Sequence, residues 1–106
     1  MELRPSRRRE RTDLYAEILE VIKRYRGQGR VTRVSYAVGM PVDRLNTALA
    51  KLLDLGLIRT TSVADVTLYD LTPRGQQFLD TYWRMRAFTE LFDRDGPPGP
   101  PEMRPG

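Results

Sequence analysis

The 106-residue chain contains neither cysteine nor histidine. Their absence excludes disulfide bonds, thiolate and imidazole metal ligands, cysteine nucleophiles and the usual general base near neutral pH. The acidic residues are scattered among basic ones, without the paired-carboxylate spacing that acid–base catalysis uses. We therefore expect a protein that is not an enzyme and that holds no metal and no cofactor.

Long apolar runs are also missing. The longest runs are a few residues, far short of the roughly 20 that span a bilayer, and the first ten residues lack the apolar segment of a signal peptide. We expect an intracellular, cytoplasmic protein with no membrane partner. The length and the 40% hydrophobic content suit one domain with a modest core.

The net charge of +4 is unevenly distributed. Residues 1–33 hold ten basic and five acidic side chains, whereas the rest of the chain holds eight basic and nine acidic ones. Clustered Lys and Arg side chains favour a polyanionic partner, because they release the counterions condensed on phosphates. A solvated tail that keeps the protein in solution explains the same charge equally well.

The first half of the chain predicts three helices. Residues 1–11 are polar and Arg-rich, which predicts a flexible arm that could extend the first helix by a turn. Thr12 then caps a helix over residues 13–26. Thr32 caps a short helix over residues 33–38, in which Val34, Ala37 and Val38 face inward. A corner at residues 39–41 leads to a helix over 42–55, whose leucines recur at helical spacing.

The second half predicts a hairpin and a long helix. Two β-like segments, residues 57–61 and 66–71, are separated by a loop of four residues. Thr72-Pro73 then begins a helix of about twenty residues, and the Pro/Gly-rich residues 93–106 predict disorder. The fold class is mainly α with a small β-hairpin: a winged helix-turn-helix over residues 12–92.

Three stretches, residues 32–40, 53–58 and 69–79, resemble the small archaeal ArnR-like winged-helix proteins. The most diagnostic pieces are Thr32-Arg33-x-x-Tyr36 and Leu71-Thr72-x-x-Gly75. The resemblance implies a short DNA-binding or chromatin-associated protein that dimerises through its C-terminal helix. The chain departs from the family at Pro41, where a Ser cap is usual, and at Asp43, which adds a negative charge near the start of the recognition helix.

In a helix-turn-helix the second helix lies in the major groove and the preceding helix lies on the backbone. The recognition helix is then residues 42–55. On this helix Arg44 would donate to guanine and Asn46 to adenine. Thr47 would offer a hydroxyl or methyl group, and Lys51 would reach a phosphate. A solvated helix face explains Asn46, Thr47 and Lys51 equally well, whereas for Arg44 we favour the DNA contact. The further expected DNA contacts are Arg33 and Ser35, Arg59 and Thr60 on the wing, and Arg7, Arg8 and Arg9 on the arm. Tyr36 suits either the core or the interface.

The last helix carries more apolar side chains than one domain can cover. We expect a symmetric homodimer through this helix. The predicted dimer residues are Tyr82, Trp83, Met85, Phe88, Leu91 and Phe92.

Three functions fit this pattern. The first is a transcription regulator that binds double-stranded DNA, the second is a less selective chromatin or architectural DNA binder, and the third is a winged helix that contacts protein. The first two place the protein on the nucleoid.

Overall fold

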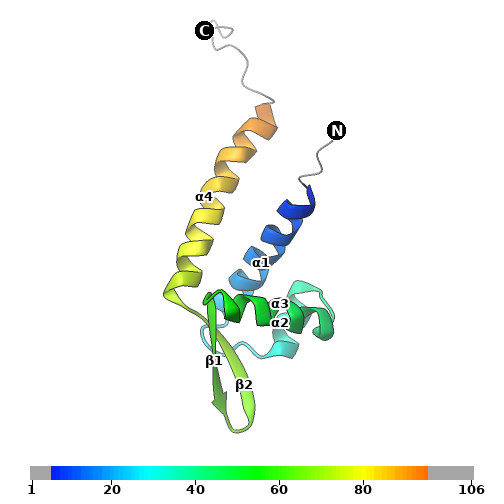
Figure 1. Cartoon of the computed structure of the whole chain (residues 1–106), viewed down its shortest axis with the longest axis vertical. Coiled ribbons are helices and arrows are strands. Elements are labelled where there is room, and N and C mark those ends of the chain that lie inside the picture. Colours follow the sequence, from blue (N-terminus) through cyan, green and yellow to red (C-terminus); the bar gives the residue numbers. More distant parts are fainter. Residues whose placement is uncertain (1–5, 96–106) are drawn as a thin grey trace, which may run out of the picture.

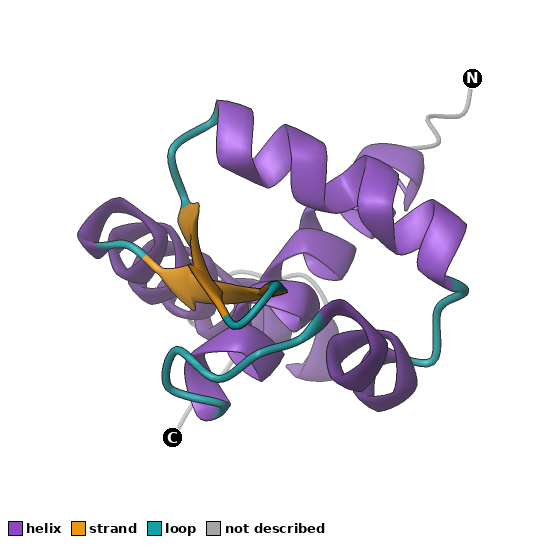
Figure 2. Cartoon of the chain, turned by 90° about the horizontal axis from the view of Figure 1, so that it is seen from below, coloured by secondary structure: helices purple, strands orange, loops and turns teal. Residues whose placement is uncertain are grey.

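The computed structural model of the chain describes residues 6–95, with side chains described for residues 11–90. The elements follow in the order α1 (Ser6–Arg24), α2 (Val31–Val38), α3 (Val42–Asp54), β1 (Ile58–Val63), β2 (Val66–Leu71) and α4 (Pro73–Asp95). Helices α1 and α4 extend away from the other elements, and the hairpin projects at the opposite end (Figure 1). Seen from the hairpin end, the two strands lie in front of the helices (Figure 2). This arrangement confirms the predicted winged helix-turn-helix.

The core forms where the apolar faces of the helices meet. Ile18, Leu19 and Ile22 of α1 are fully buried, and they pack with the leucine face of α3 and with Leu79 of α4. The α3 residues in this face are Leu45, Ala48, Leu49 and Leu52. Their spacing of three and four residues places them on one side of a helix, which leaves the other side of α3 to solvent.

Helix α1 is longer at its start than the sequence predicted. It begins at Ser6, so the segment predicted to be a flexible arm is helical from there, and Thr12 lies inside the helix instead of capping it. Residues 6–24 contain neither Gly nor Pro, and Arg and Glu are good helix formers, so nothing interrupts the helix. The helix ends at Arg24 instead of residue 26, where a φ of 47° takes Arg26 out of helical geometry.

The turn between α2 and α3 is closed as predicted by Gly39, whose φ of 77° is left-handed. Its amide donates to the carbonyl of Ser35, and the Ser35 hydroxyl donates to the carbonyl of Met40 at 2.5 Å. Helix α2 begins at Val31 with Arg30 as its N-cap, so the predicted cap at Thr32 is wrong. Ala37, predicted to face inward, is exposed.

The hairpin is tighter than predicted. Its strands pair from Ile58 with Leu71 to Val63 with Val66, which leaves a turn of two residues, Ala64 and Asp65, where a loop of four was expected. Both turn residues have positive φ, 50° and 65°, the geometry that matches the twist of the flanking strands.

The hairpin is also tied to the loop between α1 and α2. The amide of Tyr69 donates to the carbonyl of Gly29 at 2.8 Å, so residue 29 forms a bridge with β2. This contact holds the wing beside the start of α2.

Helix α4 starts as predicted. The Thr72 hydroxyl accepts from the amide of Gly75 at 3.0 Å and donates to the carbonyl of Gly56 at 2.7 Å, and Pro73 is the first helical residue. The helix continues to Asp95, so residues 93–95, predicted to begin a disordered tail, are helical. Residues 96–106 lie outside the described residues. No helix within residues 6–95 is long and apolar enough to cross a membrane.

Candidate nucleic-acid interface

The outward side of α3 is the predicted recognition surface, and its predicted contact residues are all exposed. About 100° of rotation per residue places Arg44 and Lys51 on one flank of the helix and Asn46 on the other. The ridge between the flanks carries Asp43 and Thr47. The Thr47 hydroxyl donates to the carbonyl of Asp43 at 3.4 Å. The two cations of α3 therefore lie beside the outermost line of the helix, not on it.

A second cluster, which we call the cationic junction, lies where α1 leads into α2. Its members are Lys23, Arg24, Arg26, Arg30 and Arg33, and all five are exposed. Residues 21–42 contain no Asp or Glu. The ion pairs found between described residues involve Arg59 and Arg86, so no cation of the cationic junction takes part in a direct ion pair within that part of the chain. Only Arg33 was predicted from the sequence, and the acid-free run is the signal that could have found the other four.

The start of α2 adds to this positive region. Arg30 is its N-cap without a side-chain hydrogen bond, and the first helical bond runs from the Val34 amide to the Arg30 carbonyl at 3.0 Å. The amides of residues 31–33 have no acceptor inside the helix, and they lie at its positive end. The Arg33 guanidinium stacks over the Tyr25 ring, 5.6 Å from its centroid, which favours one position for this cation.

The structure narrows the roles that the sequence allowed for Ser35 and Tyr36 of α2. The Ser35 hydroxyl is partly buried and bonded to Met40, so it closes the turn instead of facing a phosphate. Tyr36 is 90% exposed, which excludes the core position that we considered for it.

The wing offers hydroxyl groups more than charge. Arg59 is exposed, but it pairs with Asp70 on the neighbouring strand at 3.3 Å. Thr60 is exposed, and Asp65 stands at the tip. The fold therefore leaves the wing with little free positive charge.

The arginines at the start of the chain are not brought to the recognition helix. Arg7, Arg8 and Arg9 lie in the first turns of α1, at the end remote from the hairpin (Figure 1). Their side chains are outside the described residues. The predicted contact of these residues with flanking DNA stays a prediction.

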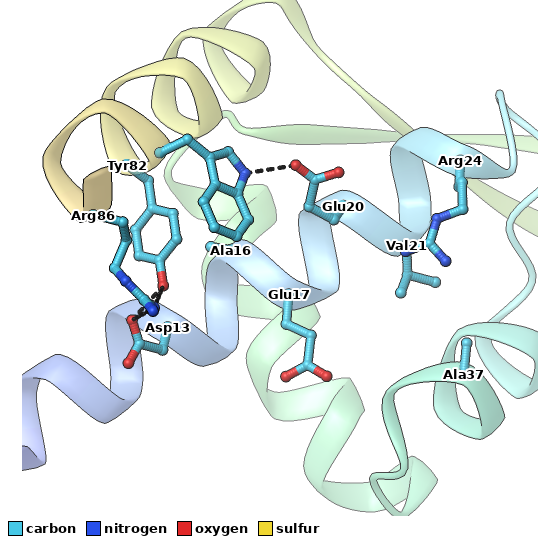
Figure 3. Close-up of a pocket in the computed structure, with 10 residues that line it drawn as sticks. Asp13, Ala16, Glu17, Glu20, Val21, Arg24, Ala37, Tyr82 and Arg86 are labelled. Atoms are coloured by element: carbon cyan, nitrogen blue, oxygen red, sulfur yellow. Dashed lines mark hydrogen bonds and ion pairs between the residues drawn. The ribbon is translucent and has the colours of Figure 1, made fainter. Parts of the chain in front are cut away.

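Helices α1 and α4 are joined by polar bonds around an open groove of about 400 Å³ (Figure 3). Tyr82 donates its hydroxyl to the Asp13 carboxylate, Arg86 approaches the same carboxylate at 3.6 Å, and the Trp83 indole donates to Glu20 at 2.7 Å. Burial, followed by the hydrogen bond to Asp13, raises the pKa of the Tyr82 hydroxyl.

The predicted dimer residues differ in how far they are exposed to solvent. Tyr82 is only 5% exposed and belongs to the core of its own chain, so its place on a dimer face is corrected. Trp83, Met85 and Phe88 are 46%, 53% and 60% exposed. Leu91 and Phe92 lie in α4, but their side chains are outside the described residues.

Nothing in the described part suggests a metal site. Among the described residues, no three or more His, Cys, Asp or Glu side chains come together in a group that could hold an ion. The carboxylates Asp13, Glu17 and Glu20 line the groove, but two of them are already bonded to α4.

Comparisons with known proteins agree with this architecture. A family model of winged helix-turn-helix proteins matches residues 8–90. The structure is similar to Sso10a-2, a DNA-binding protein from Sulfolobus solfataricus, with a TM-score of 0.69 and 18% identity over 79% of this chain and 85% of that one. It is also similar to Lactococcus lactis ZitR, a zinc-responsive MarR family member, with a TM-score of 0.54 and 17% identity over 79% of this chain and 60% of that one.

No curated protein matches the chain in sequence. The low identities to solved structures show a shared fold, and the ArnR-like branch stays a prediction. The family model covers most of the chain, from the start of α1 into α4. The chain therefore belongs to the winged helix-turn-helix family.

Proposed function

We propose that the chain is a cytoplasmic, non-enzymatic regulator of transcription that binds double-stranded DNA, and that it belongs to the archaeal ArnR-like branch. Helix α3 lies in the major groove, and the cationic junction lies on the adjacent backbone. The observation that carries the proposal is the position of the five cations of the cationic junction, which make no ion pair between described residues and lie between the end of α1 and the first turn of α2, the helix that crosses the backbone in helix-turn-helix proteins. The likeness to Sso10a-2 supports DNA binding, and the likeness to a MarR family member supports regulation.

Two groups of contacts are needed to orient α3 in the groove. The open amides at the start of α2 and the stacked guanidinium of Arg33 suit one phosphate. Arg44 and Lys51 lie on one flank of α3, where Lys51 suits a phosphate of one strand and Arg44, near the start of the helix, suits a guanine edge. This leaves the ridge of α3 for the base edges.

A DNA titration at about 50 and 200 mM salt tests the proposal, because each phosphate contact adds about 0.9 to the slope of log K against log salt. We expect Arg30→Ala and Arg33→Ala each to reduce that slope by about 1. Arg84→Ala, which removes an exposed cation on α4, is the matched control and leaves the slope unchanged. If the intact chain shows no salt-sensitive binding, the proposed function is wrong.

We further propose that a second copy of α4 covers Met85 and Phe88 in a symmetric homodimer. The two side chains are three residues apart on the flank of α4 opposite Trp83, and both are more than half exposed. Such a dimer would place two α3 helices on one duplex about 34 Å apart. Sedimentation at micromolar concentration tests this arrangement, with Met85→Glu expected to give monomers and Ala87→Glu, on the other flank, to leave the dimer intact. A monomer mass for the unmodified chain would contradict it.

Two alternatives predict different results in the DNA titration. A less selective chromatin binder on the nucleoid would bind unrelated DNA almost as well, whereas a regulator keeps a large affinity ratio. A winged helix that contacts protein is favoured by Asp43 and Asp54, two exposed carboxylates on α3, and it predicts no salt-sensitive DNA binding at all.

A further inference from the structure

We propose that Asp43 makes α3 select a cytosine at one position of its site by accepting a hydrogen bond from the N4 amino group, and that it disfavours guanine there. This inference rests on the proposed DNA-binding function. It assigns a specificity-determining role to a residue that would otherwise only weaken binding to an anion.

The position of Asp43 on α3 suits contact with a base edge. Asp43 is the second helical residue after the N-cap Pro41, it is exposed, and it lies on the ridge opposite the buried leucine face. Helical side chains lean toward the helix N-terminus, and recognition helices contact base edges with their N-terminal residues. The Asp43 carboxylate takes part in none of the ion pairs found between described residues, so it is available to a base.

The chemistry of the major groove carries the second step. An ionised carboxylate only accepts hydrogen bonds. Guanine presents two acceptors in the major groove, N7 and O6, whereas cytosine presents the N4 amino donor, and Asp or Glu accepting from cytosine is a known pairing. Adenine offers a donor beside an acceptor. A carboxylate on the ridge therefore favours cytosine and is repelled most strongly by guanine.

The neighbouring cation, Arg44, favours one orientation of the base pair. Arg44 follows Asp43 directly and lies on the flank of α3. A C·G pair presents the cytosine donor next to the guanine acceptors O6 and N7, which suit a guanidinium. Inverting the pair to G·C would place acceptors against the carboxylate and a donor against the cation.

Asp43 also has a role in the free protein. Pro41 provides no side-chain cap, and a carboxylate in the first turn is stabilising at the positive end of a helix. That role does not depend on DNA sequence. The test must therefore measure base preference, not stability or overall affinity alone.

The experiment selects bound duplexes from a random pool with the full chain, and then measures the affinity for the selected site and for the site with that pair inverted. We expect a conserved cytosine for the unmodified protein and about a tenfold loss on inversion. Asp43→Asn is expected to change the preferred base to adenine, with which an amide side chain forms two hydrogen bonds. Asp54→Asn, the same change at the far end of the same ridge, is the matched control and keeps the cytosine.

Each outcome separates this inference from the proposed function. If no duplex is retained, the proposed function is wrong. Retained duplexes would support the proposed function. The role of Asp43 is overturned if these duplexes show no preference for cytosine, if the preference persists in Asp43→Asn, or if it is lost in Asp54→Asn. Asp43→Ser, which keeps a good helix-start residue without the charge, must also lose the cytosine while its thermal unfolding shows that the protein is folded.

Discussion

Tyr82 on α4 donates its hydroxyl to the carboxylate of Asp13 on α1, 69 residues earlier in the chain. The same hydroxyl accepts from Arg86 at 3.0 Å, and the next residue, Trp83, donates to Glu20 of α1. These bonds seat the first half of α4 against α1. They therefore set the direction in which the exposed part of α4 leaves the domain.

Replacing Tyr82 by Phe removes the hydroxyl and keeps the buried ring. We expect a loss of about 1 to 2 kcal/mol in the free energy of unfolding, because two hydrogen bonds to charged groups are lost. The Asp13 carboxylate keeps its ion pair with Arg86 and its contact with solvent. Urea denaturation measures the change. Tyr36→Phe is the control, since that ring is 90% exposed, and it should unfold at the same urea concentration as the unmodified protein.

The raised pKa of Tyr82 predicts a loss of stability in alkali. Its ordinary pKa is 10.0, and burial together with Asp13 raises it in the folded state. Above pH 10 the unfolded chain releases this proton before the folded one does, so the stability contributed below pH 10 falls as the pH rises through the folded pKa. Unfolding measured between about pH 8 and 12 should show this decline, and a decline of equal size in Tyr82→Phe would contradict its assignment to Tyr82.

Leu52 and Leu53 are adjacent on α3 but have different surroundings. Leu52 is fully buried and Leu53 is 39% exposed. We expect Leu52→Ala to lower the free energy of unfolding by about 2 to 5 kcal/mol through lost burial and a cavity, and Leu53→Ala to lower it by less than about 1 kcal/mol. Equal effects in denaturant titrations would show that the leucine face of α3 is not the one buried.

Gly75 lies in the first turn of α4, where the helix backbone passes close to Leu57 and Leu71. A Cβ atom there would stand 2.1 Å from the carbonyl oxygen of Leu57 and 2.8 Å from Leu71, so we expect Gly75→Ala to cost about 3 kcal/mol or more. Gly39→Ala is the comparison, because nothing lies within 4 Å of a Cβ there and only its left-handed φ is penalised, by about 1 kcal/mol. Calorimetry distinguishes the two losses, and a milder effect at Gly75 would contradict the close approach.

Local signals in the chain were enough to place most of the helix-turn-helix. Gly39 closes α2, Pro41 precedes α3, and Thr72 with Pro73 begins α4, because each residue acts through bonds or backbone angles within a few positions of itself. The leucine spacing of α3 likewise identified its buried face. The start of α1 was predicted only in part, as an extension of one turn, since an Arg-rich segment has the same composition in a solvated arm and in a helix.

Residue chemistry narrowed the functions that we expected: the chain has no cysteine or histidine, and the basic residues of its first third favoured either a polyanionic partner or a solvated tail. Tertiary structure alone decided which residues share a surface. It withdrew Ser35 and Tyr82 from the faces predicted for them, and it placed the backbone of Arg7, Arg8 and Arg9 at the far end of α1 from the hairpin. Contacts between residues as distant as Asp13 and Tyr82 leave no periodic or local pattern in a sequence, because they form only when two helices pack.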